Sequence, residues 1–374
     1  MGAVAGAVAA VIEPLRHRVG LGWRAALASG IVSNLAAIDV VEVVAEELVD
    51  ASSRTRSAMK SLARQIPLVV HGISLGLASG APVERRRVRQ LARLLDELSP
   101  EFWSEHLAFV RAGGVEIGHL AAPPRCAETL AGLSHNVRSV ARSTGARPLL
   151  ENIATLIEPA GSVMPEAEFV RQALDAADVD LLLDLHNLHA NAQNFGFDAE
   201  RFIDSLPPHR VRAIHLAGGR WIRTRAGEPR LLDDHLHSIP ERVYELLAYV
   251  AARAVRPLTV IIERDGSYPE FSALLAEVER ARQIVNSAVR QTAPALLIDS
   301  RVVHTPVEGR ALEEFLARLY SERDLRKRFL QDRERCLQES SLTPATRSAL
   351  ASIDAAMLEL AGNSYDHKRA KRRD

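Results

Sequence analysis

The sequence predicts a (β/α)8 TIM barrel followed by a small helical appendage at the C-terminal end. Eight short runs rich in Val, Ile and Leu recur before residue 264, and longer segments with helical periodicity follow them. Continuous apolar runs of this kind are typical of parallel strands that are buried on both faces. The alternation extends over roughly 250 residues, which is the size expected of this type of barrel.

The eight predicted strands are Val19–Trp23, Val40–Val44, Pro67–His71, Phe102–Leu107, Pro148–Asn152, Val179–Asp184, Val211–Leu216 and Leu258–Glu263. The clearest predicted helices between them are Val83–Leu98, Ala127–Ser143, Glu166–Ala176 and Ile239–Ala254. A doubly wound parallel sheet is the alternative, but that fold typically has a glycine-rich phosphate loop after its first strand. No such loop follows Trp23, so the barrel is favoured.

The pattern changes after Val289, which predicts a barrel domain over 1–289 and a small helical region over 290–374. The second region is expected to begin with an irregular connector, Gln291–Pro306. Two amphipathic helices, Leu312–Leu330 and Ala345–Leu360, should follow, and then a basic disordered tail, Lys368–Arg373. Thr343 is the expected cap of the second helix, with Pro344 at its first position. The apolar stripe of the first helix either packs on the barrel or docks a partner.

Composition narrows the class of protein. Lys+Arg and Asp+Glu both total 47, so the formal net charge is zero. Such a balance gives no general attraction to nucleic acid or to an anionic membrane. Cys126 and Cys336 are too few for a disulfide framework or a thiolate zinc site, so a cytoplasmic protein is expected. The apolar segment Gly2–Ile12 lacks the basic flank of a signal peptide and the length of a membrane span, and predicts a short helix.

Polar side chains stand at or just after the ends of six of the eight predicted strands. They are His71; Glu105 and His106; Glu151 and Asn152; Asp184, His186 and Asn187; His215; and Glu263. Because the C-terminal ends of barrel strands meet at one rim, where active sites are built, these groups are expected to converge. A further pair, Asp233 and His235, follows the strand that carries His215, and two residues this far apart on an extended segment project to the same side.

Carboxylates and imidazoles crowded into one buried volume call for a cation. A buried, unpaired carboxylate costs several kcal/mol or changes its protonation state. A metal ion holds the acids ionised and the imidazoles neutral, and ligands without thiolate suit iron, manganese or zinc. The candidates outnumber the ligands of one ion, so two or three ions bridged by carboxylates are expected. The candidate ligands are His71, His106, Glu151, Asp184, His215, Asp233, His235 and Glu263.

Each of these residues alone has a simpler interpretation. A single His at a strand end is usually a hydrogen-bonded core residue, and Asn152 and Asn187 could simply fix loops. Glu42 and Glu46 are interpreted as ordinary surface or helix-entry acids. It is the joint pattern at one rim that favours a multinuclear site.

Several motifs occur in one order: His71-Gly72-Ile73-Ser74-Leu75, Ser104-Glu105-His106-Leu107, Leu150-Glu151-Asn152, Leu183-Asp184-Leu185-His186-Asn187, His215-Leu216-Ala217-Gly218 and Asp233-Asp234-His235. Together with the segment from Asn194 to Asp198, they resemble the multinuclear non-heme iron-dependent oxidative enzymes. This family includes the methanobactin-biosynthesis oxidase and relatives that act on other ribosomally made peptides.

The resemblance covers roughly Val19 to Ile284 and implies two or three irons in mixed Fe(II)/Fe(III) states, with O2 as co-substrate. It also implies oxidation of a cysteine in a precursor peptide, and a separate protein that recognises the leader of that peptide. By motif, the eight candidate ligands match ligand positions of the family, with Glu151 as the bridging carboxylate. Glu151 and Asp184 are the candidate catalytic residues, together with Asn152 and Asn187 as supporting or third-metal groups.

The chain also departs from the family pattern. His186 stands where the family has Asn, and Arg264 stands where it has Trp between the acids at 263 and 265. The family has a His three residues after an early Arg, whereas Leu27 stands three residues after Arg24 here. Leu48 stands where the family has an aromatic residue. The substrate surroundings therefore differ more than the ligands do. The alternative functions are a divalent-metal hydrolase or isomerase, endonuclease-four-like or xylose-isomerase-like, and a metal-storage protein without catalysis.

Overall fold

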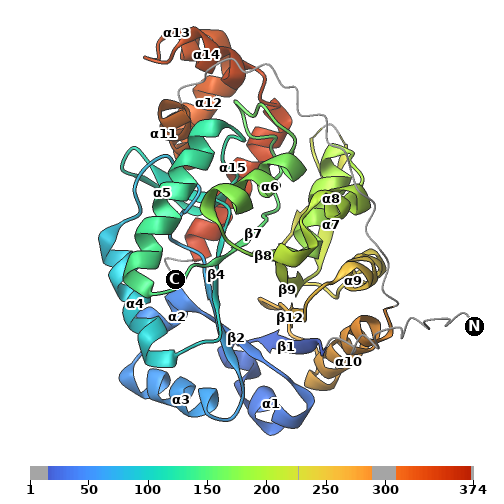
Figure 1. Cartoon of the computed structure of the whole chain (residues 1–374). Helices are drawn as coiled ribbons and strands as arrows, with labels where there is room; N and C mark the ends of the chain where they lie inside the picture. Colours follow the sequence, from blue (N-terminus) through green and yellow to red (C-terminus); the bar gives the residue numbers. More distant parts are fainter. Residues whose placement is uncertain (1–15, 226, 289–308, 372–374) are drawn as a thin grey trace, which may run out of the picture.

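The predicted barrel is present in the computed structural model, which describes residues 16–225, 227–288 and 309–371 (Figure 1). Eight parallel strands close in the order β1-β12-β9-β8-β7-β4-β3-β2. Their bounds are β1 Arg18–Gly22, β2 Val41–Val44, β3 Leu68–Gly72, β4 Trp103–His106, β7 Leu149–Glu151, β8 Leu181–Asp184, β9 Val211–Leu216 and β12 Thr259–Ile262. Every predicted strand is thus found, within two residues at either end.

The helices surround the barrel and cover the outer faces of its strands (Figure 1). They are α1 Ala28–Ser33, α2 Ala45–Val49, α3 Ser53–Ala63, α4 Arg85–Leu98, α5 Ala127–Thr144, α6 Glu166–Ala177, α7 Leu185–Phe195, α8 Ala199–Ser205, α9 Glu241–Arg253 and α10 Phe271–Ser287. Their apolar stripes and the outward strand residues form the main hydrophobic core. In α4, for example, Val88, Leu91 and Leu95 recur at helical spacing, so their side chains share one face of the helix, and all three are buried.

Two antiparallel hairpins, which the sequence analysis did not predict, rise from the C-terminal rim. β5 Phe109–Ala112 pairs with β6 Val115–Ala121, and this hairpin follows β4. β10 Gly219–Arg223 pairs with β11 Pro229–Asp233, and this hairpin follows β9. Gly113 and Gly114 have positive φ angles of 57° and 76°, which explains the tight turn of the first hairpin.

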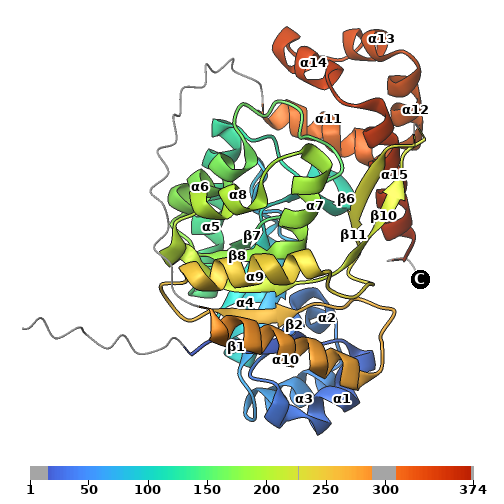
Figure 2. The same ribbon diagram turned by 90° about the vertical axis from the view of Figure 1, so that its right-hand side faces the viewer.

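The described part of the C-terminal region, residues 309–371, forms five helices rather than the two that were predicted, and Figure 2 shows their arrangement. They are α11 Gly309–Ser321, α12 Arg323–Gln331, α13 Arg333–Gln338, α14 Pro344–Ala351 and α15 Ala355–Lys371. The expected helix over 312–330 is broken at Glu322, whose backbone is extended at φ −98° and ψ 108°. Thr343 does cap α14, accepting a hydrogen bond from the Thr346 amide. The prediction of a disordered tail from Lys368 is wrong as far as Lys371, because α15 continues to that residue.

These helices share a second hydrophobic core with the β5–β6 hairpin. Phe315, Leu316 and Phe329 pack there with Phe109 and Ile117. The apolar stripe of α11 is therefore buried by the chain itself and does not face a partner. The expected helix Gly2–Ile12, the connector Gln291–Pro306 and the boundary at 289 and 290 lie outside the described residues. Within the described part of the chain, no helix is long and apolar enough to cross a membrane.

Helix α15 connects the two hairpins across the rim (Figure 2). Glu359 near its start forms an ion pair with Arg225 at the tip of the β10–β11 hairpin, at 2.8 Å. Near its end, the side chain of Arg369 lies over Gly118 of β6. Since β4 and β9 carry these hairpins and also end at the candidate site, α15 borders the mouth of the barrel.

Candidate metal centre

Five of the eight candidate ligands belong to a polar layer inside the barrel, directly above an apolar layer. The apolar layer is Val40, Val69, Phe102, Leu149, Leu182, Ala213 and Ile261. Two residues later in each strand or its extension, the residue is polar: Glu42, His71, Ser104, Glu151, Asp184, His215 and Glu263. Strand side chains alternate between faces with a period of two, so both sets point into the barrel. All seven polar side chains are buried.

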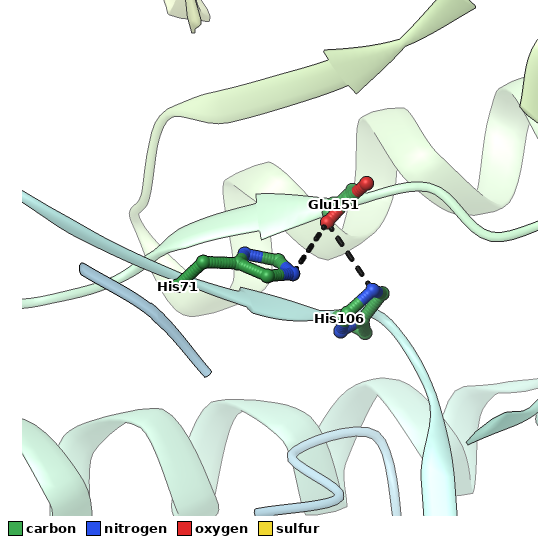
Figure 3. Close-up of side chains that lie close together, drawn as sticks. All are labelled: His71, His106 and Glu151. Atoms are coloured by element: carbon green, nitrogen blue, oxygen red, sulfur yellow. Dashed lines mark ion pairs between the residues drawn. The ribbon is translucent and has the colours of Figure 1, made fainter. Parts of the chain in front are cut away.

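Glu151 contacts imidazoles from several strands, and Figure 3 shows it between His71 and His106. Its Oε2 atom is 3.4 Å from Nε2 of His71 and 3.3 Å from Nε2 of His106. Its Oε1 atom is 3.2 Å from Nδ1 of His215. One carboxylate thus faces three imidazoles on three different strands, which is the arrangement expected of a bridging ligand.

Three groups of candidate ligands have their donor atoms within 4.8 Å of one another, among the residues that the structure describes. They are His71, His106 and Glu151; Glu151, Asp184 and His215; and Asp184, His235 and Glu263. Glu151 belongs to the first two groups and Asp184 to the last two. The groups therefore form a row of three adjacent sites in which each shared residue is a carboxylate.

Neutral hydrogen-bond partners orient the imidazoles of the first group. Nδ1 of His71 is 2.8 Å from the Ser104 hydroxyl, and Nδ1 of His106 is 3.2 Å from the Gly72 carbonyl oxygen. The Gly72 carbonyl can only accept, so the proton of neutral His106 is held on Nδ1. In both rings this contact leaves Nε2 facing Glu151, as a metal ligand requires.

The third group is held by an arginine. Nδ1 of His235 is 3.1 Å from Oε2 of Glu263. The other oxygen of Glu263 accepts a hydrogen bond from the buried Arg24 guanidinium at 3.0 Å. Arg24 is in turn paired with Asp265. Arg24 thus orients Glu263, with Oε1 toward the guanidinium and Oε2 toward His235.

The charges of the layer are strongly coupled. Burial would lower the pKa of His106, but Glu151 and Glu105 outweigh it and raise this pKa to about 9. Burial raises the pKa of Asp184 to about 7, with the nearby Glu151 charge adding to the effect. The pKa of Glu151 is lowered, because His106 and His215 outweigh its burial. Without a metal, protons on the imidazoles thus balance the carboxylates, and a cation would take their place.

Some buried carboxylate oxygens have no hydrogen-bond partner within the described residues. They include Oε2 of Glu151, which only approaches imidazole nitrogens, and Oδ2 of Asp184. An unsatisfied buried oxygen of this kind is costly, and a bound cation would satisfy it. These two oxygens belong to the two shared ligands, so the observation fits a row of metal ions.

Seven of the eight candidate ligands fall within the three groups, and Asp233 does not. Oδ1 of Asp233 instead lies 2.7 Å from Nδ1 of His186 and 2.8 Å from Nε2 of His235. His235 has a φ angle of 55°, so the segment is not extended there and the two side chains do not project in parallel. Asp233 therefore contacts two imidazoles at the edge of the row.

Asn152 and Asn187 fix the position of Asp184. The Asn152 side chain donates to the Asp184 carbonyl and accepts from its amide, both at 2.9 Å. Asn187 donates from its side chain to the Asn152 carbonyl at 3.0 Å, and its amide donates to Oδ1 of Asp184 at 2.6 Å. Oδ1 of Asp184 thus has a hydrogen-bond partner, whereas Oδ2 has none within the described residues.

Sequence reasoning missed three residues that contact the candidate ligands: Glu42, Ser104 and Arg24. Glu42 is not a surface acid, since it is 1% exposed and lies 2.9 Å from His215. The period of two could have revealed it, because Glu42 follows the apolar Val40 as His71 follows Val69. Arg24 lies beyond the end of β1, where no sequence pattern indicates its direction.

Comparison with known proteins identifies a family for this chain. The family model described as RiPP precursor modification enzyme MbnB/TglH/ChrH matches residues 18–286, which include the whole barrel. Among solved structures, a D-psicose 3-epimerase from Clostridium cellulolyticum H10, determined with D-tagatose, is 14% identical with a TM-score of 0.44. It covers 72% of this chain and 96% of that chain. A resemblance at this level says nothing about substrate.

Curated relatives are UPF0276 proteins. That of Streptomyces avermitilis is 36% identical over 277 residues, which are 72% of this chain and 55% of the relative, so the match spans only about half of that protein. That of Anaeromyxobacter sp. strain Fw109-5 is 31% identical over 67% of this chain and 87% of its own length. The chain therefore belongs to the MbnB/TglH/ChrH family of RiPP precursor modification enzymes.

Proposed function

We propose that this protein is an iron- and O2-dependent enzyme that oxidises a cysteine, or a residue near it, in a ribosomally synthesised precursor peptide. The observation that carries the proposal is the row of three ligand groups joined by Glu151 and Asp184. Family membership supports a precursor peptide as the substrate. Donors of nitrogen and oxygen type, without thiolate, suit iron.

The residues present fit such a centre. His71 and His106 with Glu151 would hold one ion, Glu151 and Asp184 with His215 a second, and His235 and Glu263 with Asp184 a third. When bound, iron in Fe(II) and Fe(III) states would supply the activation of O2 and the binding of the substrate thiolate. The two shared carboxylates account for why ions would sit next to one another.

The protein's own contribution is to hold the donors rigidly and to keep water away. Five of the seven grouped ligands project from barrel strands, whereas Glu263 directly follows β12 and His235 lies in the loop after β11. The apolar layer beneath them closes the barrel. A cavity of about 240 Å³ lies between α2 and α4, on the outer side of β3 and β4, and is lined in part by Glu46, Gln90 and Glu105. None of the candidate ligands lines it, because consecutive residues of a strand point to opposite faces.

Recognition of the precursor leader by a separate protein is part of the same proposal. The α11 stripe, with Phe315 and Leu316, is buried against the β5–β6 hairpin and so is not free to bind a leader. The region over 290–374 would instead serve the barrel domain over 1–289 by bordering its mouth, since α15 contacts both hairpins.

The test is turnover of a cysteine-containing precursor peptide by anaerobically purified, iron-reconstituted protein. We expect a change of peptide mass that requires O2, and that Glu151→Gln abolishes. Turnover that persists without O2 and with manganese or zinc would contradict the proposal and favour the divalent-metal hydrolase or isomerase. Bound metal with no O2 consumption and no product would indicate a metal-storage protein.

A further inference from the structure

The buried acid Glu42 lies behind one of the candidate ligands. It is on the inner face of β2, and its Oε2 atom is 2.9 Å from Nε2 of His215. Glu42 is 1% exposed and His215 is 0% exposed, so no water screens the contact. A buried carboxylate that touches one nitrogen of a buried imidazole controls the proton on that nitrogen.

The other nitrogen of His215 faces the candidate metal row. Nδ1 is 3.2 Å from Oε1 of Glu151 and 3.3 Å from Oε2 of Glu263. None of the three groups of candidate ligands found in the described residues includes Glu42. Glu42 and the metal row are therefore on opposite edges of the same ring.

We propose that Glu42 is a positioning residue for His215: it accepts the Nε2–H of the ring and so leaves Nδ1 as the metal-binding atom. The inference rests on the proposed metal centre and goes beyond it, because it assigns a role to an acid outside the ligand groups. An ionised carboxylate only accepts hydrogen bonds, so the proton of His215 is fixed on Nε2. The lone pair of Nδ1 is then directed toward Glu151 and Asp184.

Glu42 gives His215 a charged hydrogen-bond partner behind its metal-facing nitrogen. In the first group the corresponding hydrogen bonds go to a hydroxyl for His71 and to a carbonyl for His106, and the Glu105 carboxylate lies farther from His106, at 3.6 Å. A carboxylate behind a ligating imidazole makes the ligand nitrogen more basic, and removing such a partner typically weakens metal binding by about 10- to 100-fold. His215 belongs only to the group with Glu151 and Asp184, so the effect should be confined to one ion of the three.

The experiment measures metal binding by chelator-treated protein, without any turnover. Wild-type protein, Glu42→Gln and Glu42→Leu are titrated anaerobically with Fe(II) against a competing chelator, and the melting temperature of each metal-free protein is recorded. Glu313→Gln is the matched control, because Glu313 is also a buried carboxylate but contacts Ser79 and Gly80 instead of the candidate ligands.

We expect one ion to bind about 10- to 100-fold more weakly in Glu42→Leu, with a smaller loss in Glu42→Gln, which keeps a carbonyl acceptor. The other ions and the Glu313→Gln control should bind as in wild type. If both Glu42 variants bind every ion with wild-type affinity and only lower the metal-free melting temperature, Glu42 is merely structural and the inference is wrong. If wild-type protein binds no iron, the proposed metal centre itself fails.

Discussion

Replacing Glu151 with Gln removes the negative charge that three imidazoles share. In the metal-free protein, this charge is the largest contribution that raises the pKa of His106, which stands at about 9 against an ordinary value of 6.5. A shift of this size corresponds to at most about 3 to 4 kcal/mol of stability, at about 1.4 kcal/mol per pKa unit. Glu105 supplies part of it, so the expected loss is roughly 1 to 3 kcal/mol.

The pH dependence follows from the sign of the shift. A raised histidine pKa contributes stability that is complete below about pH 6.5 and is lost as the pH rises through about 9. Asp184 acts in the same direction, because its pKa is raised to about 7 by burial and by the Glu151 charge, and Gln removes the second cause. The deficit of Glu151→Gln relative to wild type should therefore be largest near pH 6.5 and shrink toward pH 9.5.

The assay is urea unfolding of chelator-treated wild-type and Glu151→Gln protein at pH 6.5, 8 and 9.5. NMR titration of the His106 ring provides an independent reading, with its pKa expected to fall by a unit or more in the variant. A deficit that stays constant or grows with pH, or a His106 ring that still titrates near pH 9, would refute the reasoning.

Other predictions concern residues around the row. Arg24→Ala should weaken binding of the ion held by Glu263 by about tenfold in a competitive Fe(II) titration, because the Glu263 carboxylate loses the guanidinium that orients it. Unchanged binding of all ions would contradict this. Asn152→Ala should lower the free energy of unfolding by about 1 to 3 kcal/mol, because the Asp184 amide and carbonyl lose their buried partner; a change within experimental error would count against this. Burial raises the pKa of Glu313 from 4.5 to about 7, so stability that is complete below about pH 4.5 is lost as the pH rises through about 7. Glu313→Gln should remove that part of the pH dependence in urea unfolding, and an unaltered pH profile would disprove it.

Much of the fold could be predicted from sequence, because each barrel strand is a continuous apolar run with its own beginning and end. The inward positions of the candidate ligands were also accessible, since the period of two links His71 to Val69 and Asp184 to Leu182. The same rule predicts that Glu42 points into the barrel. It predicts that Glu105 points to the other face of its strand, where its side chain accepts hydrogen bonds from the Leu75 and His106 amides.

What could not be predicted depends on tertiary contacts. The β10–β11 hairpin has an exposed strand, and Trp221 is 56% exposed, so no apolar pattern marks it. The break between α11 and α12 at Glu322 contains neither Pro nor Gly, and helix propensity alone continues through it. The order of α15 up to Lys371 likewise depends on partners far away in sequence, such as the contact of Arg369 with β6.

The most direct test of the central claim is the Mössbauer spectrum and metal content of iron-57 protein purified anaerobically. The linked groups that share Glu151 and Asp184 predict two or more irons per chain with spin coupling, and loss of that coupling in Glu151→Gln. A single uncoupled iron, or stoichiometric zinc or manganese in protein that is active with those metals, would contradict the account.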